Sequence, residues 1–152
     1  MLSHITSPEE MYMHPMSELG GQLAQLEVLL ERIAKCKKVA RVEEVVVGSV
    51  WAVLQEMWYR VSVNTVTHGQ VELQSIDYGH YLRVNHHGHH LHHLPPGLAS
   101  TLPALAVKCL LSRVKPVLDK GWDKLALQIY ISNYKTGTKT IIKKYLRLNL
   151  VI

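Results

Sequence analysis

The middle of the chain alternates apolar and polar residues in short runs, and tight turns separate the runs. A period of two over such runs is typical of strands with one buried face. Turn-forming residues stand between them, most clearly at Asp77-Tyr78-Gly79-His80. Short strands joined by such turns predict a small antiparallel barrel. Its strands are expected at residues 45–54, 58–66, 71–76 and 81–84.

The segment before the barrel has the period of a helix. Leu19, Leu23, Leu26, Leu30 and Ile33 recur at spacings of three and four, so they share one helix face. The stripe covers only about two heptads, which is short for a coiled coil. We therefore expect this helix to pack against its own domain.

The remaining segments predict elements that bring the two ends of the chain together. Residues 4–14 are typical of a strand that breaks at Pro8, and residues 98–111 are typical of a helix. Residues 122–134 mix helix and strand signals, and residues 141–152 are β-rich. Each flank is too small to hold a core alone, so we expect them to form a second lobe together. The buried face of the 98–111 helix would contain Leu102, Leu105, Ala106, Cys109 and Leu110.

The composition narrows the class of protein. A chain of 152 residues suits one compact domain. Cys36 and Cys109 lack the spacing of a metal site and predict free thiols in a reducing compartment. The N-terminus has no signal-peptide pattern. No uncharged apolar stretch is as long as the roughly 18 residues that a membrane helix needs, so no membrane span is expected.

Short motifs follow one another along the chain in an order that is more specific than any single motif. They are Ser7-Pro8 with Tyr12, Gly48, Trp58-Tyr59-Arg60, Asp77-Tyr78-Gly79-His80, Leu94-Pro95, Leu102-Pro103, Ala106, Cys109-Leu110 and Trp122. This order resembles the extended Tudor family over nearly the whole chain. The family has Asp-Tyr-Gly-Asn where this sequence has His80 as the fourth residue.

The resemblance implies an α+β, mainly β fold in which a Tudor barrel is inserted into a staphylococcal-nuclease-like, OB-type lobe. Residues 1–152 would form one extended Tudor domain. Residues 1–44 would supply a lobe strand and the linker helix, residues 45–85 the barrel, and residues 86–152 the rest of the lobe.

The resemblance also implies binding rather than catalysis, without a cofactor. Such domains read symmetrically dimethylated arginine in arginine-rich tails, notably those of Piwi-type Argonaute proteins in germ-cell small-RNA pathways. Each aromatic face of the binding cage attracts the guanidinium by roughly 0.5–2 kcal/mol, and the methyl groups gain further by leaving water. A cytoplasmic location in a perinuclear germ granule is implied as well.

The aromatic cage carried over from the family is incomplete in this chain. Tyr59 and Tyr78 match two of its walls. Ser75 stands where a third wall would be, and Val53 or Leu54 stands where the first strand would supply a fourth. Losing two walls removes roughly 1–4 kcal/mol of attraction, or about one to three decades of affinity. Ordinary barrel packing remains an alternative role for the two tyrosines.

The residues beside the missing walls also differ in what they offer a ligand. His80 replaces the asparagine that orients the guanidinium, and it would accept a hydrogen bond when neutral but repel a cation when protonated. Asp77 keeps the family residue and would pair with Arg60 to brace the turn. We therefore expect the tail of a Piwi-type protein to bind with weak or no dependence on methylation. A symmetric dimethylarginine reader with a non-standard cage is the alternative.

Two other binding functions are suggested by clusters of one residue type. Lysines and an arginine near the C-terminus, with Tyr134 and Tyr145 between them, would suit RNA or form a solvated strand face. The run from His86 to His93 suggests zinc, but real sites draw ligands from separate elements. We therefore expect these histidines to be dispensable for stability. The basic residues of the C-terminal cluster are Lys135, Lys139, Lys143, Lys144 and Arg147, and the net charge of the whole chain is +5.

A nuclease is the enzyme alternative, because the second lobe resembles a nuclease fold. Metal-assisted phosphodiester cleavage needs clustered carboxylates, and the lobe segments have only scattered ones. No catalysis is therefore expected. The carboxylates concerned are Glu9, Glu10, Glu18, Glu27, Glu31, Asp119 and Asp123.

Overall fold

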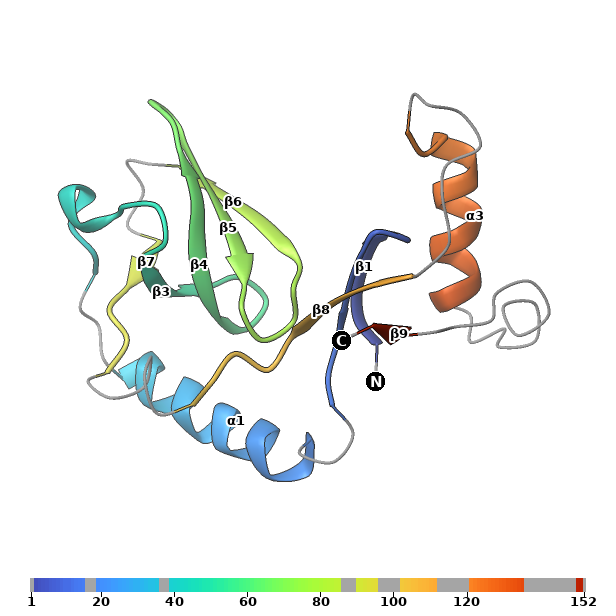
Figure 1. The fold of residues 1–152 in the computed structure, drawn as a ribbon. Coiled ribbons are helices and arrows are strands. Elements are labelled where there is room, and N and C mark those ends of the chain that lie inside the picture. Colours follow the sequence, from blue (N-terminus) through green and yellow to red (C-terminus); the bar gives the residue numbers. More distant parts are fainter. Residues whose placement is uncertain are drawn as a thin grey trace.

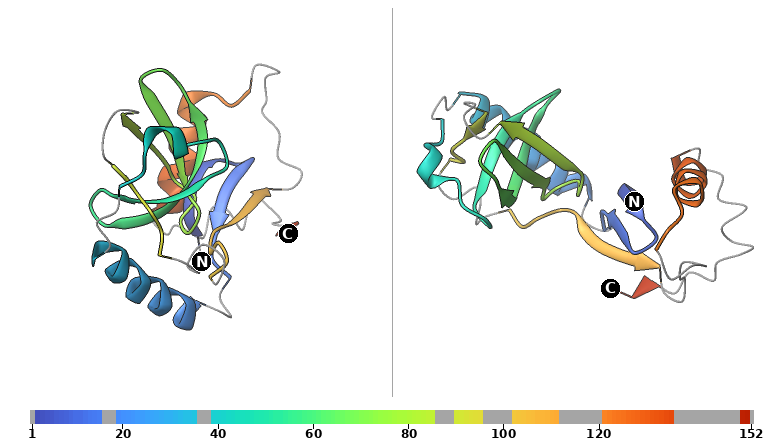
Figure 2. Two further views of the ribbon diagram at one scale, coloured as in Figure 1. Left: turned by 90° about the vertical axis from the view of Figure 1, so that its left-hand side faces the viewer. Right: turned by 90° about the horizontal axis from the view of Figure 1, so that it is seen from above.

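Two antiparallel β-sheets lie side by side, and the chain passes from one to the other and back (Figures 1 and 2). The computed structural model describes residues 2–15, 19–35, 39–85, 90–95, 102–111, 121–135 and 150–151. Its elements are β1 (Leu2–Ser7), β2 (Glu10–Met13), α1 (Leu19–Lys35), the 3-10 helix η1 (Val42–Glu44), β3 (Val50–Leu54), β4 (Trp58–Val66), β5 (Gln70–Ser75), β6 (Tyr81–Asn85), β7 (Leu91–His92), β8 (Val107–Leu111), α3 (Lys124–Lys135) and β9 (Leu150–Val151).

The five-stranded sheet has the order β6-β5-β4-β3-β7 and curls around an apolar core. Alternate residues fill that core, among them Val61 and Val63 of β4 and Val71 and Leu73 of β5. The predicted antiparallel barrel is confirmed. The sheet also includes β7, which pairs with β3 and lies after residue 85, where the sequence placed the end of the barrel.

Helix α1 lies along the outer side of this sheet (Figure 1). Leu26 and Leu30 are buried in a second core with Ala52 of β3 and with Leu102 and Leu105 of the returning chain. The helix therefore packs on its own domain, as predicted. Leu26 and Leu30, which lie on one helix face, thus remove apolar surface of the sheet from water.

The second sheet joins segments from both ends of the chain. Its order is β1-β2-β8-β9, with Met11 of β2 opposite Cys109 of β8. Ile5, Met11, Cys109 and Leu111 form its core, and Tyr130 of α3 packs against them. In the sequence, the barrel strands therefore fall between the segments that form this second sheet, as expected for a barrel inserted into a lobe.

The prediction of a helix at 98–111 is wrong for the part of this segment that the structure describes. Residues 107–111 form strand β8, with Cys109 and Leu111 buried and Leu110 48% exposed. The apolar residues fit a period of two as well as a helix stripe, and pairing with β2 decides between them. Just before the strand, the carbonyls of Leu102 and Pro103 bond to Arg60 and so are not free for a helix.

The expected strand at 45–54 is also too long. The strand β3 begins only at Val50, because the chain reverses at Gly48, whose φ is +84°. The Ser49 hydroxyl donates to the Val46 carbonyl at 2.5 Å and fixes this turn. The mixed signals at 122–134 resolve as helix α3, because Asp123 Oδ1 accepts the Leu125 amide at 2.8 Å and caps its first turn.

The end of the histidine run belongs to the barrel. His92 lies opposite Ala52 in the β3–β7 pair, and its ring centroid is 5.0 Å from that of Trp58. The His93 ring contacts Trp51 at 4.9 Å. The expectation that the whole run is dispensable therefore needs correction at these two positions. His86, His87 and His89 lie outside the described residues.

Replacing His92 with Ala is expected to lower the free energy of unfolding by about 1 kcal/mol, because an aromatic pair contributes roughly 0.5–1.5 kcal/mol. His90 is exposed in the same run, so His90→Ala should change stability by less than about 0.5 kcal/mol. Urea denaturation followed by circular dichroism compares the two variants. Equal losses would show that the Trp58 contact does not stabilise the barrel.

Candidate functional site

Three rings gather at the end of the barrel that faces the second sheet. Tyr59 is the second residue of β4, and Tyr78 and His80 belong to the turn between β5 and β6. The ring of Tyr59 lies 5.8 Å from that of Tyr78 and 4.8 Å from that of His80. The Tyr78 and His80 rings are 6.2 Å apart. All three side chains are half-buried.

The rings meet edge to face rather than as parallel walls. The interplanar angle is 87° between Tyr59 and Tyr78 and 79° between Tyr59 and His80. A planar cation held between two facing rings needs roughly 7 Å between them, about twice a van der Waals contact. These rings are closer and tilted, so a guanidinium would contact their outer faces. Such a contact offers cation–π attraction without a closed box.

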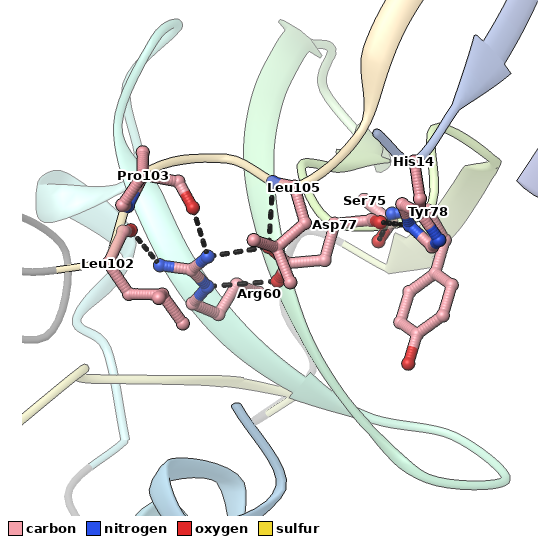
Figure 3. Close-up of polar contacts among 8 residues, drawn as sticks. All are labelled: His14, Arg60, Ser75, Asp77, Tyr78, Leu102, Pro103 and Leu105. Carbon is pink, nitrogen blue, oxygen red and sulfur yellow. Dashed lines mark hydrogen bonds and ion pairs between the residues drawn. The ribbon is translucent and has the colours of Figure 1, made fainter. Parts of the chain in front are cut away.

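A buried ion pair joins Arg60 of β4 to Asp77, the residue before Tyr78 in the turn (Figure 3). The guanidinium of Arg60 donates from Nε and Nη2 to the two oxygens of Asp77, at 2.9 and 2.5 Å. The side chains are 0% and 1% exposed. Because Arg60 follows Tyr59 and Asp77 precedes Tyr78, this pair fixes the backbone beneath both rings. The predicted pairing is confirmed, but it is buried and not a surface contact.

The ion pair also ties the barrel to the chain that returns from it. Arg60 donates to the carbonyls of Leu102 and Pro103 at 2.6 and 3.0 Å. Oδ1 of Asp77 further accepts the Leu105 amide at 3.4 Å. The buried guanidinium thus has the Asp77 carboxylate and two backbone carbonyls as acceptors, as a buried charge requires.

The second lobe supports the turn from its other side. His14 Nε2 lies 2.5 Å from the carbonyl oxygen of Asp77, and its ring packs edge-on to Tyr78 at 5.7 Å. The Ser3 hydroxyl donates to the Tyr78 carbonyl at 2.9 Å. Within the turn, Ser75 Oγ accepts the Tyr78 amide at 3.2 Å. The position of Tyr78 is therefore set by both lobes.

Tyr12 of β2 covers the tightest point of the turn. Its hydroxyl accepts from Gln74 Nε2 at 2.5 Å and donates to Glu10 Oε1 at 3.1 Å. The same carboxylate oxygen accepts from Tyr81 at 2.7 Å and pairs with Lys108 at 3.2 Å. Partial burial raises the pKa of Glu10. The bonds from Tyr81, Lys108 and Tyr12 outweigh that effect, so the pKa lies below its ordinary value.

His80 stands where the two lobes meet. Its ring centroid lies 6.1 Å from that of His4 in β1. Burial, and after it the nearness of His4, lowers the pKa of His80 below its ordinary value. The imidazole is therefore neutral at pH 7.4 and able to accept a hydrogen bond.

The predicted site residues separate into two groups. Tyr59, Tyr78 and His80 are brought together at the surface. Val53 lies in the barrel core, and Ser75 and Asp77 are also buried, so these three side chains do not face a ligand. Leu54 is 52% exposed in the β3–β4 hairpin, where Met57 is 40% exposed.

The sequence did not identify the contribution of the second lobe. Ser3, His4 and His14 reach the turn from more than sixty residues away in the chain. Their local pattern gives no sign of this contact. Tyr12 was part of a motif, but its position over Gly79 was not predicted.

Several expectations concern residues beyond the described ranges. The basic residues Lys139, Lys143, Lys144 and Arg147, with Tyr145, lie outside them, as does Cys36. Within the described ranges, no cluster of three or more His, Cys, Asp or Glu side chains has the geometry of a metal site. Among the described helices, none is long and apolar enough to cross a bilayer.

Solved structures with a fold similar to this one are extended Tudor domains. The extended Tudor domain of BmPAPI superposes with a TM-score of 0.71 at 23% identity, covering 88% of this chain and 75% of that one. Extended Tudor domain TD3 of mouse TDRD1, in complex with a MILI peptide containing dimethylarginine, gives 0.71 at 22% identity, covering 86% and 67%.

A third similar structure is the Drosophila melanogaster Papi extended Tudor domain in complex with an unmethylated Piwi N-terminal peptide. It gives a TM-score of 0.72 at 19% identity, covering 88% of this chain and 67% of that one. The same domain has also been solved with a dimethylated Piwi peptide. No curated protein sequence matched the chain.

The sequence model that describes the Tudor domain matches residues 1–113. Tudor domains are binding modules rather than enzymes. The mostly β architecture, with its curled five-stranded sheet and two helices, matches the fold of extended Tudor domains. The chain therefore belongs to the Tudor domain family, and its fold is that of an extended Tudor domain.

Proposed function

We propose that this domain is a non-catalytic scaffold module that binds the arginine-rich tail of a Piwi-type protein, with little dependence on arginine methylation. The relatives' complexes support the class of ligand, since Papi was solved with both unmethylated and dimethylated Piwi peptides. Following the family resemblance, we place its work in a cytoplasmic germ granule.

The observation that carries the proposal is the edge-to-face packing of Tyr59, Tyr78 and His80. Methyl groups add affinity when aromatic walls enclose them and remove them from water. Rings that pack on one another leave the methyl groups of a bound arginine largely in solvent. The cationic charge is still attracted by the exposed ring faces, so arginine itself is recognised more strongly than its methylation.

The test is a calorimetric titration with one arginine-rich peptide in unmodified and symmetrically dimethylated forms. We expect a preference of less than about tenfold for the dimethylated peptide, equivalent to under about 1.4 kcal/mol. A preference of a hundredfold or more would favour a dimethylarginine reader with a non-standard cage. Absence of binding to either form would contradict the proposed function.

Variants of the ring cluster locate the binding site. Tyr59→Ala and Tyr78→Ala should each weaken binding of both peptides by about twofold to thirtyfold, because each ring contributes roughly 0.5–2 kcal/mol. Leu125→Ala is the matched control, since Leu125 is 64% exposed on α3 in the other lobe. Equal effects of all three substitutions would exclude the barrel end as the site.

The burial of Ser75 changes how a cage would be rebuilt. The family resemblance suggests an aromatic cage wall at position 75. Because Ser75 is 1% exposed, an aromatic ring there would overpack the barrel interior. His80→Asn restores the family residue without adding volume. It is therefore the better substitution for raising the preference for methylated arginine.

A further inference from the structure

Among the described residues, the imidazole nitrogens of His80 remain available for a hydrogen bond to a ligand. No described residue makes a hydrogen bond to its imidazole nitrogens, although the ring is half-buried among Tyr59, Tyr78 and His4. A buried polar ring normally has a partner. The backbone of His80 is fixed, since its carbonyl accepts the Ser75 amide at 2.9 Å. The free imidazole nitrogen is thus held in place beside the faces that would contact an arginine.

We propose that His80 is a specificity-determining residue of the arginine site, and that protonation of the His4–His80 pair across the lobe boundary releases the arginine. This inference rests on the proposed function. Neutral His80 accepts a hydrogen bond from the guanidinium, in place of the amide oxygen that asparagine would offer. Protonated His80 has no acceptor and carries the same charge as the ligand.

The surroundings of the pair determine the direction of this effect. The charged groups that face the boundary are Glu10 of β2 and Lys108 of β8, and they pair with each other at 3.2 Å. His14 and the phenols of Tyr12, Tyr59, Tyr78 and Tyr81 also lie near this boundary. The carboxylates of Glu10 and Asp77 are already paired with Lys108 and Arg60.

Protonation also acts on the lobe contact itself. His4 belongs to β1 of the second lobe, whereas His80 belongs to the barrel turn. Two imidazolium rings with centroids 6.1 Å apart repel one another. The same protons that remove the hydrogen-bond acceptor therefore weaken the boundary on which the turn rests. A domain with asparagine at this position has neither property.

The sign of the pH dependence follows from linkage. The neutral form of His80 binds the cation, so affinity is highest above the pKa of His80 and falls as the pH decreases through it. Burial and His4 lower that pKa below its ordinary value. Affinity should therefore be constant near pH 7.5 and fall only at pH values below the ordinary His pKa of about 6.5.

The experiment measures binding of an unmethylated Arg-Gly peptide without His, Asp or Glu, by calorimetry at pH 7.5 and 5.0. The wild-type domain should bind more weakly at pH 5.0 than at pH 7.5, by up to about tenfold for each pH unit below the pKa of His80. His80→Asn should change by less than about twofold. The matched control His68→Asn, in the exposed turn between β4 and β5, should behave as wild type.

A second measurement does not need the peptide. In the free domain, NMR titration should show His80 changing charge below its ordinary pKa, and His4→Asn should move that titration to higher pH. An unchanged titration would overturn the coupling between the lobes. Binding that is equally strong at both pH values would overturn the role of His80 and leave the proposed function intact. Absence of binding even at pH 7.5 would overturn both.

Discussion

Asp77→Ala is expected to lower the free energy of unfolding by about 3–5 kcal/mol, the usual cost of removing one partner of a buried ion pair. The guanidinium of Arg60 is 0% exposed and would lose its carboxylate partner while keeping the carbonyls of Leu102 and Pro103. A domain of this length loses roughly 2–4 °C of melting temperature per kcal/mol. The melting temperature should therefore fall by roughly 6–20 °C.

The matched control is an exposed ion pair in the same barrel. Arg83 and Glu72 lie 2.8 Å apart, and their side chains are 71% and 40% exposed. Glu72→Gln should cost less than about 1 kcal/mol, as for exposed pairs in general. Urea denaturation of both variants compares the two sites directly. A loss for Asp77→Ala within 1 kcal/mol of that for Glu72→Gln would mean that the buried pair contributes little.

A milder substitution covers the case in which Asp77→Ala does not fold. Asp77→Asn keeps the shape and one acceptor oxygen, so it should lose less stability than the alanine variant while still leaving the guanidinium charge uncompensated. Because Asp77 precedes Tyr78, the asparagine variant should also shift the aromatic resonances of Tyr59 and Tyr78. Such a shift would link the ion pair to the position of the ligand-binding rings.

The barrel could be predicted from sequence because its information is local. The alternation in β4 and β5 and the turn residues at 77–80 each act over a few neighbouring residues. The conformation of residues 102–111 could not be predicted in this way, because it depends on contacts with residues that are distant in the sequence. Arg60 donates hydrogen bonds to the carbonyls of Leu102 and Pro103, and β2 pairs with residues 107–109. The apolar spacing alone fits either a helix or a strand.

The same distinction explains the candidate site. Tyr59 and Tyr78 stand in motifs that are read from the sequence, and the structure brings them together. The pairing of Arg60 with Asp77 was predicted, but its burial was not, because the covering residues lie more than forty positions further along the chain. His4 and His14 depend on how two lobes dock. No local pattern encodes that docking, so these residues were missed.

Gly79→Ala is the second substitution with a large expected effect, because two independent costs add at this position. The backbone φ of Gly79 is +86°, a conformation that costs an L-residue about 1–2 kcal/mol. A Cβ atom there would also overlap the ring of Tyr12, which is held by Gln74 and Glu10. Overpacking of this kind costs a further 1–3 kcal/mol or so.

Gly48 separates the two costs. Its φ is +84°, but a Cβ there would meet no atom within 4 Å. Gly48→Ala should therefore cost only about 1–2 kcal/mol, and Gly79→Ala roughly 2–5 kcal/mol. Both values come from urea denaturation. NMR should further show that Gly79→Ala perturbs the amides of β2 as well as those of its own turn, whereas Gly48→Ala acts only locally. Equal costs for the two glycines, with β2 unperturbed, would mean that Tyr12 does not hold the turn from the second lobe. The position of His80 would then depend on the barrel alone.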